Sequence, residues 1–187
     1  MKVLTAVKMA HYLLQDKLAG TRLVVDATAG NGNDTLFLAL NTPPDCRILA
    51  FDVQQDAITK TKQLLQVQGL VEKVQLILDS HVHITDYCPF PPDVIMFNLG
   101  YLPGGIHSIT TTAETTVSAV QASLGILVTG GIITIAAYHG HSEGQRELET
   151  LRSFLERIPQ ETYTVACWQM INQKNRPPIL YIIEKKG

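Results

Sequence analysis

The feature that most constrains the fold is a regular alternation of short apolar runs with amphipathic helical segments. Apolar runs that predict strands cover residues 23–26, 48–53, 74–78, 94–98, 132–137, 163–171 and 179–184. Segments with helical periodicity lie between them, at residues 34–40, 54–68, 115–128 and 143–158. Because parallel strands need a crossover, which is usually a helix, this alternation predicts an α/β fold with a mostly parallel seven-stranded sheet.

The strands also indicate how the sheet is covered and how it ends. VIMF and IITIAA are apolar without interruption, which is typical of strands buried by helices on both faces. The last two strands have no helix between them, so residues 172–178 are expected to join them as an antiparallel hairpin at the sheet edge. Near the start, apolar residues recur at helical spacing and predict a helix packed on the body: Val3, Leu4, Val7, Ala10, Leu13 and Leu14.

Composition sets limits on the class of protein. Hydrophobic residues make up 45% of the 187 residues and charged residues 17%, which fits one compact domain over residues 1–187. The net charge of −2 provides no overall basic field for nucleic acid, although it does not exclude RNA. Cys46, Cys88 and Cys167 are far apart and form no CxxC pair, which predicts reduced thiols and a cytoplasmic location. No run of eighteen apolar residues predicts a membrane span.

A glycine turn follows the first predicted strand, in the segment DATAGNGNDT at residues 26–35. It lacks the third glycine of a dinucleotide-binding loop and the GK[ST] of a P-loop. An acidic strand end before Gly30 and a second glycine suits S-adenosylmethionine, whose cationic end Asp26 and Asp34 can neutralise. The alternative is a simple helix-capping turn with Asn33 or Asp34 as the cap.

Polar residues also follow the second and third strands. Asp52 is placed to accept ribose hydroxyls, or to cap the next helix, and Gln54 beside it either flanks an adenine or only begins that helix. Asp79 and Ser80 are placed to reach an adenine edge, with an ordinary turn as the alternative. His81 and His83 alternate, but without a third ligand they do not predict a metal site.

The fourth and fifth strands end in segments suited to a second substrate. In NLGYLPGG, the side-chain carbonyl of Asn98 or a nearby backbone carbonyl can accept a hydrogen bond from an amine, and Tyr101 offers a platform for a flat base. The alternative is that the segment is only a glycine-rich crossover with a core tyrosine. His139 is placed to take a proton, or is a surface histidine. Lys174 and Arg176, in the last connection, could touch phosphate or be simply solvated.

Four of these segments resemble one family across nearly the whole chain. DATAGNGNDT, FDVQQDAI, NLGYLPGG followed by SITT, and NQKNRPPILYIIEKK are similar to the small bacterial class I methyltransferases long labelled rRNA methylases. That family includes the tRNA 5-aminomethyl-2-thiouridine methyltransferases. The resemblance implies a Rossmann-like methyltransferase fold, S-adenosylmethionine as cofactor, and a homodimer.

The resemblance further implies N-methylation of 5-aminomethyl-2-thiouridine at the wobble position of a tRNA anticodon loop. Carried over by motif, the residues that would hold the cofactor are Asn31, Asn33, Asp34, Asp52, Gln54, Ser80 and His81. Asn98, Gly100 and Tyr101 would lie where the amine and the sulfonium meet. Two other readings stay open: a methyltransferase acting on rRNA or a small molecule, and a binding module that only senses the cofactor.

Overall fold

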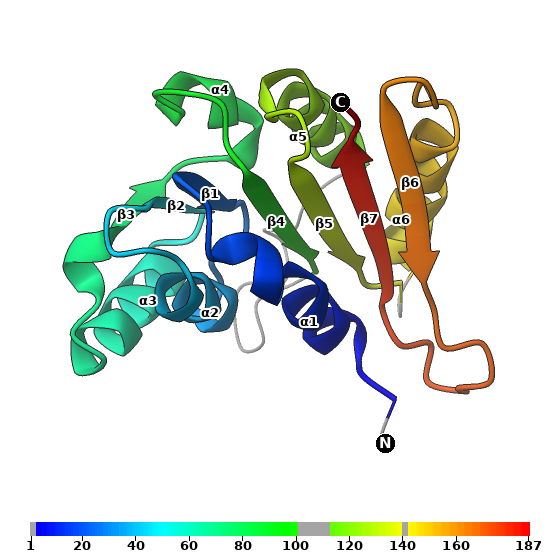
Figure 1. Ribbon diagram of the computed structural model, residues 1–187. Coiled ribbons are helices and arrows are strands. Elements are labelled where there is room, and N and C mark those ends of the chain that lie inside the picture. Colours follow the sequence, from blue (N-terminus) through cyan, green and yellow to red (C-terminus); the bar gives the residue numbers. More distant parts are fainter. Residues whose placement is uncertain (1–2, 101–112, 140–141) are drawn as a thin grey trace.

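The computed structural model describes residues 3–100, 113–139 and 142–187, and contains one seven-stranded sheet (Figure 1). The strands are β1 (Leu23–Asp26), β2 (Arg47–Asp52), β3 (Val74–Leu78), β4 (Val94–Leu99), β5 (Ile132–Ala137), β6 (Tyr163–Trp168) and β7 (Ile179–Lys185). Their order across the sheet is β3-β2-β1-β4-β5-β7-β6. The first five strands are mutually parallel, and β7 is antiparallel to both of its neighbours.

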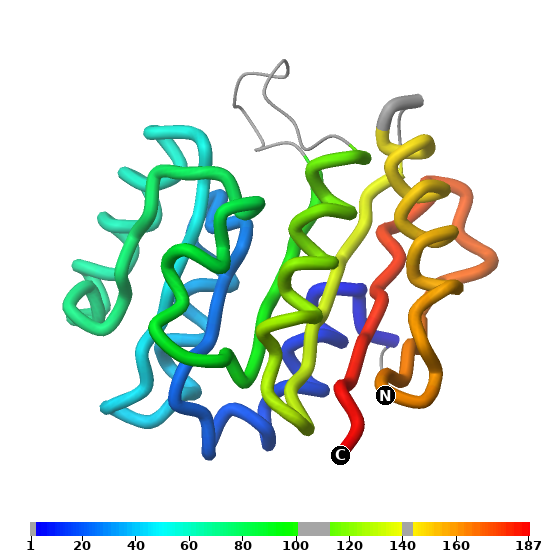
Figure 2. Tube along the Cα trace, turned by 90° about the horizontal axis from the view of Figure 1, so that it is seen from above, coloured from blue at the N-terminus to red at the C-terminus, as the bar shows by residue number. Residues whose placement is uncertain are grey.

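Helices cover both faces of this sheet. They are α1 (Ala6–Leu18), α2 (Asn33–Asn41), α3 (Gln55–Val67), α4 (Ile84–Tyr87), α5 (Ala113–Ile126) and α6 (Ser142–Leu155), with short 3₁₀ turns η1 (Val71–Lys73) and η2 (His81–His83). One apolar cluster joins the sheet to α1, α2 and α3, and a second joins it to α4, α5 and α6. Figure 2 shows α5 and α6 on one side of the sheet and α1 on the other.

The side chains of the central strands explain this two-sided packing. In β1, Val24 belongs to the first cluster and Val25 to the second, and both are fully buried. Successive side chains of a strand point to opposite faces, so an uninterrupted apolar strand must be covered on both. The predicted fold class is therefore confirmed. In the described part of the chain, no helix is long and apolar enough to cross a membrane.

The structure differs from the sequence prediction at the last hairpin. The strand predicted over residues 163–171 ends at Trp168, which pairs with Leu180. Pro177 and Pro178 precede β7 on the opposite side, and because proline has no N–H, the ladder cannot continue past them. The antiparallel hairpin itself lies at the sheet edge as predicted, with β6 outermost. The sequence prediction also missed η2 and α4, which follow β3.

Helix α1 docks through one face, and this face offers a matched pair of substitutions. Leu14 is fully buried in the cluster on the α1 side, whereas its neighbour Leu13 is 43% exposed. We predict that Leu14→Ala lowers the free energy of unfolding by about 2–5 kcal/mol, since it leaves a cavity. Leu13→Ala should change it by no more than about 0.5 kcal/mol. Urea unfolding of both variants checks this, and equal losses would contradict the docking of α1 described here.

Candidate functional site

The order of the strands creates a topological switch point at the carboxyl edge of β1 and β4, which is where open α/β sheets have their binding crevice. From β1 the chain proceeds outward to β2 and β3, and then crosses back to β4 on the other side of β1. Helical connections therefore leave β1 and β4 in opposite directions, and open α/β sheets bind ligands at such a switch point. The segments that follow β1, β2, β3 and β4 all begin at this edge.

The loop after β1 is fastened to the strands on both sides of β1. The Ala27 N–H donates to the Met96 carbonyl of β4 at 2.8 Å, and the Ala29 N–H donates to the Phe51 carbonyl of β2 at 2.7 Å. The Gly30 N–H donates to Oδ2 of Asp52 at 2.9 Å. These bonds satisfy buried backbone groups and hold the loop in one shape at the edge of the sheet.

Two glycines in this loop adopt backbone angles that other residues rarely reach. Gly30 has φ 54° and Gly32 has φ 82°, and Gly32 precedes the first turn of α2. A Cβ on Gly32 would lie 3.0 Å from both the Cα and the Oγ1 of Thr61 in α3. Gly32 therefore serves two needs, a left-handed turn and close packing of α2 against α3.

Asp34 lies at the centre of the polar contacts in the site. It is 5% exposed, in the first turn of α2. Its Oδ1 accepts a hydrogen bond from Nε2 of His11 in α1 at 2.6 Å, and its Oδ2 accepts one from Nδ2 of Asn98 at 3.0 Å. The backbone N–H of Asn98 donates to Oγ1 of Thr28 at 2.7 Å. The structure thus brings the predicted residues Asp34 and Asn98 into direct contact.

Asp26 supports the loop from within. It is fully buried, accepts from the Thr28 N–H at 3.0 Å, and accepts from Oγ1 of Thr35 at 2.6 Å. Burial, together with the nearby Asp34 carboxylate, raises the pKa of Asp26 to about 7. Its carboxyl group is directed into the loop and α2, where it holds the shape of the loop.

Asp52 and Gln54 follow β2. The Asp52 carboxylate accepts from the Gly30 N–H through Oδ2 and from the Gln54 N–H through Oδ1, each at 2.9 Å. Each carboxylate oxygen has a second lone pair, so Asp52 keeps the capacity to accept from hydroxyl donors. Gln54 precedes α3 and is half-buried, and its side chain makes no capping hydrogen bond.

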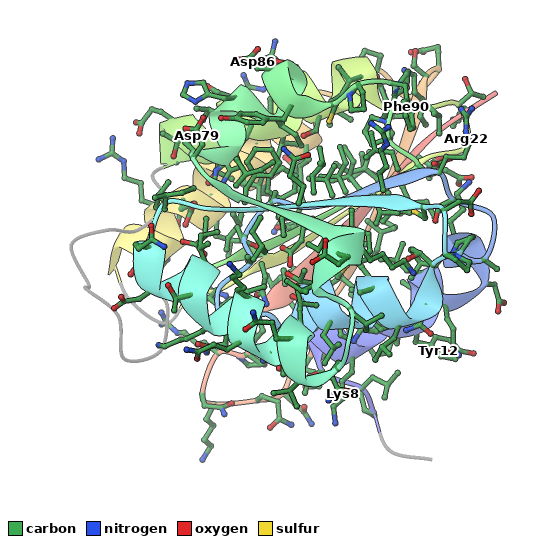
Figure 3. All side chains as sticks on the ribbon, turned by 90° about the vertical axis from the view of Figure 1, so that its left-hand side faces the viewer. Lys8, Tyr12, Arg22, Asp79, Asp86 and Phe90 are labelled. Atoms are coloured by element: carbon green, nitrogen blue, oxygen red, sulfur yellow. The ribbon has the colours of Figure 1, made fainter. Side chains whose placement is uncertain are left out.

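Asp79 and Ser80 follow β3 and are occupied by local contacts. Asp79 accepts from the Ser80 N–H at 2.7 Å, from His83 Nδ1 at 3.0 Å and from the Tyr87 hydroxyl at 2.9 Å. The His83 contact, together with the other two, lowers the pKa of Asp79. Ser80 caps η2 through its hydroxyl. Figure 3 shows Asp79 beside the segment that leads into α4.

His81 is buried beneath the loop after β1. It is 7% exposed, and its Nδ1–H donates to the Ala27 carbonyl at 3.2 Å. Burial lowers the pKa of His81, which favours the neutral ring with Nε2 as an acceptor. That buried Nε2 has no hydrogen-bond partner in the part of the chain that the structure describes. His83 pairs with Asp79 instead, and the described residues contain no cluster of three or more potential metal ligands.

The end of β4 and the end of β5 meet beside Asn98. Gly100 is exposed, and a Cβ there would lie 3.4 Å from the ring of Tyr138, which follows β5. His139 follows Tyr138, and its Nδ1 is buried with no hydrogen-bond partner among residues 3–100, 113–139 and 142–187. Tyr101, predicted to face the substrate, lies outside the described residues.

Sequence reasoning missed three residues of this site. His11, Thr28 and Thr35 make the contacts that hold Asp34, Asn98 and Asp26. The pattern of α1 shows His11 only as an interruption of an apolar face, because its partner lies 23 residues along the chain. Both threonines lie within DATAGNGNDT. A carboxylate at the end of a buried strand, as at Asp26, needs hydrogen-bond donors close by, and this need is the signal that could have identified them.

The residues at this edge fit S-adenosylmethionine. The ligand has a cationic amino-acid end and a sulfonium. The site has carboxylates at Asp34 in α2 and Asp52 at the end of β2, and Asn31 and Asn33 are exposed beside the glycine turn. S-adenosylmethionine also carries hydroxyl and amine groups that donate hydrogen bonds. Nε2 of His81, which has no partner among the described residues, is an acceptor that needs such a donor. The carboxylates and the His81 ring therefore offer hydrogen-bond acceptors to a ligand that is positively charged and carries many donors.

Comparison with known proteins agrees with this chemistry. The family model described as "Putative rRNA methylase" matches residues 48–184. A crystal structure from Clostridium thermocellum with the same description is 41% identical and has a TM-score of 0.95, covering 99% of this chain and 100% of its own. A Streptococcus mutans methyltransferase solved in complex with SAH is 37% identical, with a TM-score of 0.90 over 98% of this chain and 99% of its own.

A plant relative is also similar over nearly the full chain. It is the chloroplastic tRNA (mnm(5)s(2)U34)-methyltransferase of Arabidopsis thaliana, 36% identical over 97% of this chain and 70% of its own length. The fold and the carboxyl-edge site together define a class I, S-adenosylmethionine-dependent methyltransferase. Within that class, the chain belongs to the rRNA methylase family, as its motifs predicted.

Gly32 and Gly69 provide a test of the close packing in the loop. Both have positive φ, 82° and 69°, but a Cβ on Gly69 would meet nothing within 4 Å. We predict that Gly69→Ala lowers the free energy of unfolding by about 1–2 kcal/mol through backbone strain alone. Gly32→Ala should cost about 1–3 kcal/mol more, because Thr61 must shift. Thermal and urea unfolding measure both, and equal losses would exclude the packing role.

The raised pKa of Asp26 predicts a dependence of stability on pH. Because its pKa of about 7 in the folded protein lies above the ordinary 3.8, the folded state binds more protons between these values. The contribution of Asp26 to stability is therefore complete below about pH 4 and is lost as the pH rises to about 7. Asp26→Asn should thus gain stability relative to wild type across that range. A constant difference in urea unfolding from about pH 4 to pH 8 would contradict this.

Proposed function

We propose that the protein N-methylates 5-aminomethyl-2-thiouridine at the wobble position of tRNA, with S-adenosylmethionine as donor. The observation that carries the proposal is the similarity to the Arabidopsis tRNA (mnm(5)s(2)U34)-methyltransferase over 97% of this chain. The arrangement of Asn98 at the switch point supports it, because an amide held beside a carboxylate suits a nitrogen nucleophile. The same proposal includes a homodimer and a cytoplasmic location, although the Arabidopsis relative is named chloroplastic.

Residues at the ends of β1, β2 and β3 would hold the donor. The set is Gly30, Asn31, Asn33, Asp34, Asp52, Gln54, Ser80 and His81, with Asn98 and Gly100 at the methyl end. When bound, S-adenosylmethionine supplies an electrophilic methyl group on a cationic sulfur. Asp52 would accept from the ribose hydroxyls through lone pairs that the loop leaves unused. Asp26 would keep the loop in shape from below.

Asn98 would orient the substrate nitrogen. Its Nδ2 donates to Asp34, so its carbonyl oxygen is the group that accepts an N–H from the amine and aims the lone pair at the methyl carbon. Alignment of this kind can lower the activation free energy by on the order of 7–11 kcal/mol. The amine reacts in its neutral form, which a neighbouring positive charge favours. The nitrogen would take the methyl group as the methyl–sulfur bond breaks and S-adenosylhomocysteine is released. The proton that the nitrogen sheds would pass to water or to His139, whose Nδ1 has no partner among the described residues.

A basic segment at the same edge suits an anionic polymer. Strand β6 runs parallel to β5, since both are antiparallel to β7, so residues 169–178 begin at the carboxyl edge of the sheet. Lys174 and Arg176 are exposed there, and Arg176 is directed to α6 by a 3.3 Å bond to Gln145. Phosphates of an anticodon stem could pair with these cations. Because the wobble base lies in a single-stranded loop, its access to the crevice requires little unstacking.

The decisive experiment compares acceptors. Purified protein with labelled S-adenosylmethionine is given tRNA carrying 5-aminomethyl-2-thiouridine, the same tRNA without the aminomethyl group, and ribosomal RNA. Label should appear only in the first, as 5-methylaminomethyl-2-thiouridine on nucleoside analysis. Label in ribosomal RNA instead would favour the second candidate, to which the family description points. Label in neither would refute the tRNA proposal and leave a small-molecule acceptor or a sensor.

Asn98→Ala tests the role given to the amide. We predict a fall in kcat of about a hundredfold, because the amine loses its orientation. Affinity for S-adenosylhomocysteine should change by less than about threefold. Asn41→Ala is the matched control, since the Asn41 side chain lies at the far end of α2 and donates to the Phe37 carbonyl. Full turnover by Asn98→Ala would exclude the proposed role.

A further inference from the structure

Helix α1 contacts the site through a histidine side chain. His11 reaches the site through the 2.6 Å hydrogen bond from its Nε2 to Oδ1 of Asp34, which joins α1 to α2. Its ring also stacks on Phe37 of α2, with ring centroids 3.8 Å apart and planes 2° from parallel. Asp34 and Phe37 are one helical turn apart, so α2 presents an acceptor and a flat support to the same imidazole.

The stacking and the hydrogen bond together fix the imidazole. A carboxylate only accepts hydrogen bonds, so Nε2 must carry the proton that is shared with Asp34. The His11 side chain is 24% exposed and that of Asp34 is 6% exposed, so the bond lies at the boundary of the core, where water competes little. A charge-assisted bond in such a place is stronger and more directional than one at the surface.

The second oxygen of Asp34 transmits this constraint to Asn98. Because Oδ2 accepts, the Asn98 amide must turn Nδ2 toward α2, and its carbonyl oxygen then takes the other side. The Asn98 backbone is fixed separately by Thr28. Were Asp34 free to rotate about χ1 and χ2, the amide could reverse and present an N–H to the substrate amine, which needs an acceptor there.

We propose that His11 is a positioning residue for methyl transfer, acting through Asp34 to hold the Asn98 amide with its carbonyl oxygen toward the substrate nitrogen. The identity of the amine rests on the proposed function, whereas the contacts from His11 to Asp34 and from Asp34 to Asn98 are independent of it. His11 touches neither substrate nor cofactor in this account. It provides the bond that prevents Asp34 from turning, and Asp34 determines which end of the Asn98 amide faces the crevice.

Two substitutions at His11 separate the bond from the packing. His11→Phe keeps a flat ring on Phe37 and removes the donor, whereas His11→Gln places an amide N–H near the position of Nε2. We expect His11→Phe to lower kcat by about ten- to a hundredfold, as a small misplacement at the reacting nitrogen does. KM for S-adenosylmethionine and affinity for S-adenosylhomocysteine should stay within about threefold. His11→Gln should recover most of kcat.

Tyr12→Phe is the matched control on the same helix. Tyr12 is 67% exposed, and Figure 3 shows it at the outer margin of the molecule on the α1 side. It should keep wild-type kcat. Wild-type kcat in His11→Phe, or a loss of kcat that His11→Gln does not recover, would overturn the proposal. So would a loss of kcat in His11→Phe that is accompanied by an equal loss of S-adenosylhomocysteine affinity.

A second readout does not depend on the acceptor. The side-chain N–H₂ resonances of Asn98 can be assigned by their absence in Asn98→Asp, in protein saturated with S-adenosylhomocysteine. They should move in His11→Phe, return toward wild type in His11→Gln, and stay in place in Tyr12→Phe. If wild type methylates no tRNA, the proposed function fails while these shifts still decide the role of His11. Unmoved resonances in His11→Phe would overturn it even if the tRNA activity is found.

Discussion

The structure of the site depends on how the loop after β1 is fastened between two strands that belong to opposite halves of the sheet. Ala27 bonds to Met96 of β4, while Ala29 and Gly30 bond to Phe51 and Asp52 of β2. At a switch point the flanking connections lead away in opposite directions, and these bonds hold the loop at the edge between them. The two positive-φ glycines let the chain make these bonds and still enter α2 directly.

Burying a carboxylate costs free energy unless hydrogen-bond donors surround it, and the residues around the loop provide those donors. Asp26 is satisfied by Thr28 and Thr35, and Asp34 by His11 and Asn98. The partners of Asp34 come from α1 and β4, which are far apart in sequence. One carboxylate therefore joins the helix that precedes the sheet to the strand that ends beside the predicted methyl-transfer point. These two hydrogen bonds hold Asp34 and Asn98 in a defined orientation, and such orientation favours catalysis by alignment.

The sequence predicted the fold far better than it predicted the contacts. Strand positions follow from the apolar runs, so β1, β3 and β5 have the predicted bounds, and the edge hairpin is confirmed. The positions of Asp34, Asp52 and Asn98 at one edge follow from strand ends alone. The pairing of His11 with Asp34 could not be predicted, because it depends on where α1 packs. The end of β6 at Trp168 was missed because its cause lies in the other strand of the hairpin. Pro177 and Pro178, just before β7, have no N–H to donate, so β6 has no pairing partner beyond Trp168.

The central claim is that the carboxyl-edge loops at β1, β2 and β4 form one binding site for the methyl donor. A crystal structure of the protein grown with S-adenosylhomocysteine tests it most directly. The account predicts one molecule per chain over the Gly30–Gly32 turn, with its ribose hydroxyls on Asp52 and its sulfur toward Asn98. Density for the ligand anywhere else on the chain, with this crevice left unfilled, would contradict it.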